Sequence, residues 1–157
     1  MDASAHILPR TRRDVRPGER AVLGALGLRA GAGHARDGLI AAVRQGLPAT
    51  SFLRVVHRAG VSRDEAIRAL RVARASLFRK LAARRRLSPD ESQKVVRLAR
   101  AILLAEYVLE DARRGQAWLR EPVPALGGEL PIDLLDTEEG ARTVEETLLR
   151  LEYGILA

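Results

Sequence analysis

The chain has 157 residues, and 27 Lys and Arg against 20 Asp and Glu give it a formal net charge of +7. This length suits one domain or two small helical ones with a modest core. The absence of cysteine excludes disulfides and thiol catalysis, and charged residues interrupt the longest apolar stretch, 95–109, so we expect a cytoplasmic protein with no membrane partner.

Residues 1–36 are rich in Arg, Gly, Ala and Pro and show no sustained hydrophobic period. This composition favours a disordered or loosely ordered arm, which we predict for 1–36. A short helix is possible over 20–28, where four apolar side chains could share one face: Ala21, Val22, Ala25 and Leu28.

Helical periodicity begins at Asp37, which we expect to cap a helix that ends at Gly46. After a short break, Thr50 or Ser51 can start the next helix. Gly60 follows the last apolar position of that helix, where a glycine commonly ends helices in a left-handed conformation. The sequence therefore predicts two consecutive amphipathic helices between residues 37 and 60.

Ser62 and Glu65 have the spacing of a capping box, which predicts a short helix over 63–71. After a small-residue turn at 72–73, a second helix is predicted over 74–86. The side chains that share its inner face are Leu77, Phe78 and Leu81, because each residue turns the helix by about 100°.

A capped short helix, a tight turn and a second helix with a basic outer face are typical of a helix-turn-helix. In that motif the second helix enters the major groove, where Arg can bind guanine at two points. An ordinary basic hairpin is the alternative, because the turn lacks a glycine and Ala73 is a poor cap. The predicted DNA-binding residues are Arg74, Ser76, Arg79 and Lys80, with Arg84 behind them.

The clearest helix start is Ser88, which is followed by Pro89 at the first helical position and by Glu91, which completes a capping box. The helix is predicted to run to about Glu110, and apolar side chains cover most of its circumference. Such a helix must be covered on several sides. In so small a protein we expect a central core helix completed by a second subunit, and therefore a homodimer.

A shorter helix is predicted over 111–120, followed by a loop over 125–128 and one helical turn after Pro131. Thr137 is expected to cap the last helix, which Gly154 ends. The apolar stripe of that helix consists of Ala141, Val144, Leu148 and Leu151. No segment alternates with period two over a useful length, so the sequence predicts an all-α protein.

The sequence shows no credible set of catalytic groups. His6, His34 and His57 are scattered, and the glycine-rich stretch 24–33 lacks the preceding strand that a phosphate-binding loop requires. We therefore expect a protein that is not an enzyme and that binds no metal and no cofactor.

Charge is divided unevenly along the chain. Residues 1–86 contain 19 Lys and Arg and 6 Asp and Glu, whereas residues 87–157 contain 8 and 14. A basic half is attracted to a polyanion, because neutralised phosphates release counterions. The acidic half would be repelled by the same polyanion, so the chain is expected to have two kinds of partner.

Several short motifs in the C-terminal half resemble one known family. They are LSPDE at 87–91, WLR at 118–120, PALGG at 124–128, PIDLLDT at 131–137, Gly140, Val144 and LEYGILA at 151–157. In this order they resemble the Xre/MbcA/ParS-type antitoxins, which pair with RES-domain toxins in bacterial type II toxin–antitoxin operons. The resemblance covers about residues 45–157.

This resemblance implies an Xre-like helix-turn-helix domain over 37–86, which represses its own operon, and a dimerisation and toxin-binding domain over 87–157. The toxin would consume NAD⁺, and the antitoxin would block its active site. The implied toxin-binding residues are Leu148, Leu151, Glu152, Tyr153, Gly154, Ile155 and Leu156. The implied structural positions in the loop and the start of the last helix are Gly127, Gly128, Pro131, Thr137 and Gly140. The alternative is a free-standing DNA-associated regulator or adaptor without a toxin partner.

Overall fold

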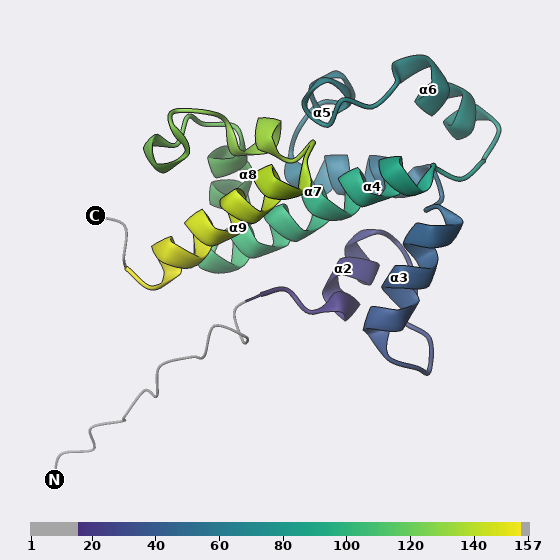
Figure 1. The fold of residues 1–157 in the computed structure, drawn as a ribbon, viewed down its shortest axis with the longest axis horizontal. Coiled ribbons are helices and arrows are strands. Elements are labelled where there is room, and N and C mark those ends of the chain that lie inside the picture. The colour runs from purple at the N-terminus through teal and green to yellow at the C-terminus, as the bar shows by residue number, and fades with distance from the viewer. Residues whose placement is uncertain (1–15, 155–157) are drawn as a thin grey trace, which may run out of the picture.

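The computed structural model describes residues 16–154. This part of the chain is helical and contains no β-strand (Figure 1), which confirms the predicted all-α fold. In chain order the elements are α2 (Glu19–Ala25), α3 (Ala35–Gln45), α4 (Thr50–Ala59), α5 (Arg63–Ala69), α6 (Arg74–Ala82), α7 (Pro89–Val108), α8 (Ala112–Leu119), the 3-10 helices η1 (Pro124–Leu126) and η2 (Pro131–Leu134), and α9 (Glu138–Glu152).

Helix α7 begins at the predicted capping box and forms the centre of the fold. The Ser88 side chain accepts a hydrogen bond from the Glu91 N–H at 3.1 Å, and the Glu91 carboxylate accepts one from the Ser88 N–H at 2.7 Å. Helices α2, α3, α4, α8 and α9 of the same chain contact α7. Its apolar circumference is thus covered within one chain, so this feature no longer supports a homodimer, which stays a prediction.

Residues 19–28 pack into the fold, and the predicted disordered arm is wrong for this part of 1–36. Val22, Leu23 and Leu26 are buried, and the Ser51 hydroxyl donates a hydrogen bond to the Leu26 carbonyl at 2.7 Å. The helix that seemed possible over 20–28 is present as α2. Burial of its apolar face stabilises order in a stretch whose average composition favours disorder. Residues 1–15 lie outside the described part of the chain.

Three helix ends in the N-terminal half test the predicted caps. Gly60 ends α4 with a φ of 67°, as predicted. Asp37 lies in the first turn of α3 instead of capping it, because that helix begins two residues earlier. Ser62 caps α5 by accepting a hydrogen bond from the Glu65 N–H. The Glu65 carboxylate accepts a hydrogen bond from Arg120 at 3.1 Å instead, so the predicted box is half formed.

Helix α6 is shorter than the helix predicted over 74–86. It ends at Ala82, and Arg84 has a φ of 51°, a left-handed angle at which the helix cannot continue. Of the predicted inner residues, Leu77 is fully buried and Leu81 is half-buried, whereas Phe78 is 37% exposed. Phe78 lies about 100° around α6 from Leu77, outside the face that this helix buries.

Helix α9 lies along α7 (Figure 1) and completes the C-terminal half. Thr137 caps α9 as predicted, because its side chain accepts a hydrogen bond from the Gly140 N–H at 3.1 Å. Ala141, Val144 and Leu148 of the predicted stripe are buried. The last helix is therefore held against the central helix by an apolar face that was recognisable in the sequence.

Candidate functional site

The outer face of α6 brings together three of the predicted DNA-binding residues. Ser76, Arg79 and Lys80 line one hollow of about 440 Å³. Arg79 is exposed and forms no ion pair within the described residues. The Lys80 ammonium, in contrast, lies 2.6 Å from the Glu91 carboxylate, and its side chain is only 23% exposed. Lys80 thus ties α6 to the cap of α7, and its contact with DNA stays a prediction.

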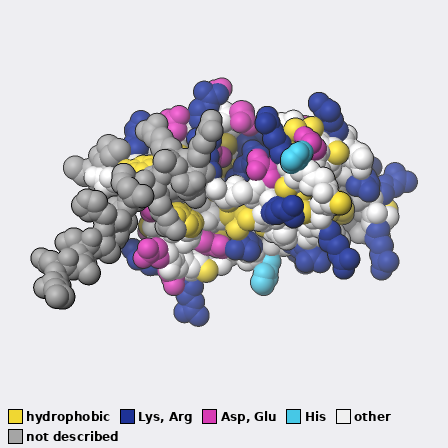
Figure 2. Space-filling model, turned by 90° about the horizontal axis from the view of Figure 1, so that it is seen from below, with side chains coloured by type: hydrophobic (Ala, Val, Ile, Leu, Met, Phe, Trp, Pro, Cys, Tyr) yellow, Lys and Arg dark blue, Asp and Glu magenta, His cyan; other side chains and the backbone are white. Residues whose placement is uncertain are grey.

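The other two predicted DNA-binding residues differ in their surroundings. Arg74 forms an ion pair with Asp64 of α5, and its guanidinium lies 5.1 Å from the centre of the Phe78 ring, a cation–π contact. Arg84 lies beyond the end of α6 and is exposed. Lys and Arg side chains crowd the end of the molecule that includes α6, at the right of Figure 2. This end is basic as a surface, although α6 itself offers few unpaired charges.

A second pair of helices, α4 and α5, also has the features of a helix-turn-helix. Helices α4 and α5 are joined by a three-residue turn in which Gly60 adopts a left-handed φ, Val61 is buried and Ser62 caps the second helix. A short turn that contains glycine is typical of this motif. Arg63 and Arg68 of α5 are exposed and form no ion pair within residues 16–154. The turn between α5 and α6 is similar, because Arg71 has a left-handed φ of 50° and Val72 is buried, so the predicted α5–α6 pair stays a prediction.

The predicted toxin-binding residues fall into three groups. Leu148 is fully buried in the chain's own core, so it cannot face a partner, and this prediction is corrected. Leu151, Glu152 and Tyr153 are half-buried at the end of α9, and Gly154 is exposed with a φ of 64°. Ile155 and Leu156 lie outside the described residues.

The loop before α9 is shaped by glycine, and the structure shows two separate reasons. Gly127 and Gly128 have φ angles of 70° and 82° with open space around them, so their conformation is what requires glycine. Gly140 has no such angle, but a Cβ there would overlap the carbonyl oxygen of Leu134. Pro131 is buried and is the first residue of η2.

Arg97 of α7 holds this loop in place through hydrogen bonds and an ion pair. Its guanidinium donates hydrogen bonds to the carbonyl oxygens of Leu135 and Asp136, both at 2.8 Å, and lies 3.8 Å from the Glu138 carboxylate. The Arg97 side chain is only 10% exposed. Nothing in its sequence neighbourhood indicated this role, because the partners are 38 or more residues away.

Two carboxyl groups have shifted pKa values for different reasons. Burial tends to raise the pKa of Glu91, but hydrogen bonds from Lys80 and Ser88 together outweigh it, and the pKa is lowered from 4.5. Burial raises the pKa of Glu145 on α9, although Arg16 and Arg100 oppose the effect. Glu91 is therefore a structural carboxylate, and neither group has a catalytic arrangement around it.

Residues 16–154 contain no cluster of His, Asp and Glu that could hold a metal ion. Within the same range no helix has the length and apolar character needed to cross a membrane.

Both halves of the chain match known protein families. The antitoxin Xre-like helix-turn-helix domain matches residues 38–100, and the antitoxin Xre/MbcA/ParS C-terminal toxin-binding domain matches residues 104–154. A curated relative from Sphingobium sp. (strain YBL2), the "Prs ADP-ribosylating antitoxin", is 54% identical over 41 residues, which are 26% of this chain and 26% of the relative. With a DNA-binding and a toxin-binding domain in this order, the chain belongs to the Xre/MbcA/ParS-type antitoxins.

Proposed function

We propose that the chain neutralises a RES-domain toxin that consumes NAD⁺ and that it represses its own operon by binding DNA in the cytoplasm. The observation that supports this proposal most is the succession of the two antitoxin domains along one chain. The relative's name also refers to ADP-ribosylation, a reaction that consumes NAD⁺. The proposed halves are 37–86 for DNA and 87–157 for dimerisation and the toxin.

The toxin-binding surface is proposed at the end of α9 and the residues after it. Leu148 anchors the helix in the core, while the following turn, with Leu151, Glu152 and Tyr153, is only half-buried. A rigid helix that projects a partly exposed last turn is suited to enter a partner's cleft, because little conformational entropy is lost on binding.

Two helices are proposed as alternatives for reading DNA: α6, with the predicted Arg74, Ser76, Arg79, Lys80 and Arg84, and α5, with Arg63 and Arg68. Arg63 and Arg68 lie on the second helix of the α4–α5 pair, whose turn and cap match the motif. If α5 reads the DNA, Arg79 and Arg84 would add contacts to phosphates from the neighbouring basic surface.

Co-expression with the RES-type protein encoded next to this chain tests the toxin half. The full chain is expected to restore growth and to form a complex, and a chain shortened to residue 150 is expected to lose both effects. Removal of residues 1–15 is the matched control and is expected to leave neutralisation intact. If the shortened chain still neutralises, the proposed surface is wrong. If the full chain neither binds nor protects, a DNA-binding regulator without a toxin is the better description.

A further inference from the structure

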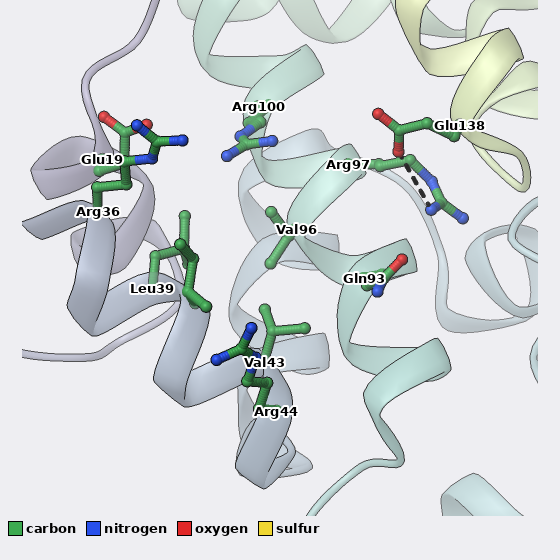
Figure 3. Close-up of a pocket in the computed structure, with 11 residues that line it drawn as sticks. Glu19, Arg36, Leu39, Val43, Arg44, Gln93, Val96, Arg97, Arg100 and Glu138 are labelled. Carbon is green, nitrogen blue, oxygen red and sulfur yellow. Dashed lines mark ion pairs between the residues drawn. The ribbon is translucent and has the colours of Figure 1, made fainter.

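A groove of about 390 Å³ lies between α3 and α7, and none of the residues that line it is among those proposed to contact DNA or the toxin (Figure 3). Three of its arginines come from opposite walls: Arg36 and Arg44 from α3, and Arg100 from α7. None of the three forms an ion pair within residues 16–154. The volume falls within the range of small-molecule sites, roughly 300–1,000 Å³.

The floor of the groove is apolar. Leu39 and Val96 are 4% and 5% exposed, and Ile40 beside them is 39% exposed, which makes it one of the two exposed large hydrophobic residues in the described chain. The exposed part of Ile40 is available to contact an apolar ligand in the hollow.

The charges around the floor do not balance. Arg97 is turned away toward Glu138 (Figure 3), and these two residues pair with each other at 3.8 Å. Arg36 and Arg100 lie at one end of the groove, with Glu19 beside Arg36, and Arg44 lies at the other end. Arg100 also lies near Glu145, whose carboxylate is 3.8 Å from Arg16. Apart from the Arg97–Glu138 pair, the groove therefore contains three guanidinium groups and one carboxylate. The excess positive charge favours the binding of an anion.

We propose that this groove binds a small phosphate monoester with an apolar or aromatic body. Guanidinium groups bind phosphate oxygens in a bidentate manner, so the phosphate would lie between Arg36 and Arg100. The body would lie on Leu39, Ile40 and Val96. A dianionic phosphate suits two or three guanidinium groups better than a carboxylate with a single charge does.

A helical peptide is a less suitable occupant, because the volume corresponds to a small molecule and the floor is short. The groove wall between Arg36 and Arg44 spans eight residues of α3, which is about 12 Å. DNA is also less suitable, since a regular phosphate backbone makes no use of an apolar floor.

Calorimetric titration of the full chain with phenyl phosphate tests the proposal, with inorganic phosphate and phenylacetate as comparison probes. We expect one phenyl phosphate per chain, bound about tenfold or more tightly than either comparison probe, because both the charges and the floor contribute. Arg36→Gln and Arg100→Gln should each weaken binding by about tenfold. Glu19→Gln should strengthen it, because it removes the one carboxylate beside the phosphate.

Two further variants separate the site from general charge. Arg113→Gln, an exposed arginine of α8 with no ion pair in the described chain, should leave binding unchanged. Ile40→Asn should weaken phenyl phosphate but not inorganic phosphate. Equal binding of both phosphates, or an equal loss with Arg113→Gln, would overturn the proposal. It would also be overturned if a DNA duplex displaced phenyl phosphate and the same variants weakened the duplex equally.

Discussion

The Arg71 side chain reaches from the turn after α5 to Asp136 at the start of α9, with 3.1 Å between its Nε and the carboxylate. Lys94 of α7 donates a hydrogen bond to the Arg71 carbonyl at 3.1 Å, and Arg97 holds the Asp136 carbonyl from the same helix. Hydrogen bonds and an ion pair among Arg71, Lys94, Arg97 and Asp136 therefore connect the DNA-binding half to the loop that precedes α9.

Arg97→Met should destabilise the protein by about 2–3 kcal/mol, because it removes charge-assisted hydrogen bonds from two partly buried carbonyl groups while keeping an apolar stem of similar length. Urea denaturation followed by circular dichroism measures the change. Arg142→Met, in an exposed ion pair on α9, is the control and should change stability by less than about 0.5 kcal/mol. Similar losses in both variants would contradict the role given to Arg97.

Gly140→Ala should destabilise the protein by about 2 kcal/mol or more, because the new Cβ overlaps the Leu134 carbonyl oxygen and forces η2 away from α9. Thermal denaturation measures the loss. Gly24→Ala is the opposite control: Gly24 lies within α2 with no atom near its Cβ position, so alanine should raise stability by about 0.5–1 kcal/mol. Stabilisation by both substitutions would show that α9 does not need a close approach at Gly140.

Glu91→Gln should destabilise the protein more at pH 7 than at pH 3. The pKa of Glu91 is lowered from 4.5 in the folded chain, so the ionised carboxylate stabilises the fold fully at pH values above 4.5. This contribution is lost as the pH falls through the lowered pKa, where the wild-type side chain also becomes neutral. Urea denaturation at both pH values measures the difference. A loss that is the same at pH 3 and pH 7 would assign the effect to packing.

If α5 reads the DNA, Arg63→Gln and Arg68→Gln should weaken binding to the promoter DNA of the chain's own operon and reduce its preference over unrelated DNA. Each lost base contact costs about 1–3 kcal/mol. Arg79→Gln should weaken binding to both DNAs alike and reduce the salt dependence by about one phosphate contact. Fluorescence anisotropy across a salt series measures both quantities. The reverse pattern, with base preference lost only in Arg79→Gln, would assign DNA reading to α6.

The features that the sequence predicted correctly are those that depend on a few neighbouring residues. The caps at Ser62, Ser88 and Thr137 and the end of α4 at Gly60 each involve hydrogen bonds or backbone angles within about one helical turn. The apolar stripe of α9 repeats over about three turns and was equally clear. These local interactions were sufficient for the all-α fold and for most helix starts.

The features that the sequence did not predict depend on which elements meet. Val22 and Leu26 are buried because α2 packs against α3, α4 and α7. Lys80 is occupied because the cap of α7 lies beside α6. Each outcome requires the relative placement of helices, which hydrophobic periodicity alone does not contain.

The two family domains meet inside α7, between residues 100 and 104, within a helix that is continuous from Pro89 to Val108. There is no linker at this border, so the two halves cannot rotate freely against each other. With 3.6 residues per turn, one inserted residue would turn the second half by about 100° and advance it by about 1.5 Å. The length of α7 thus fixes how the DNA-binding domain and the toxin-binding domain are oriented relative to each other.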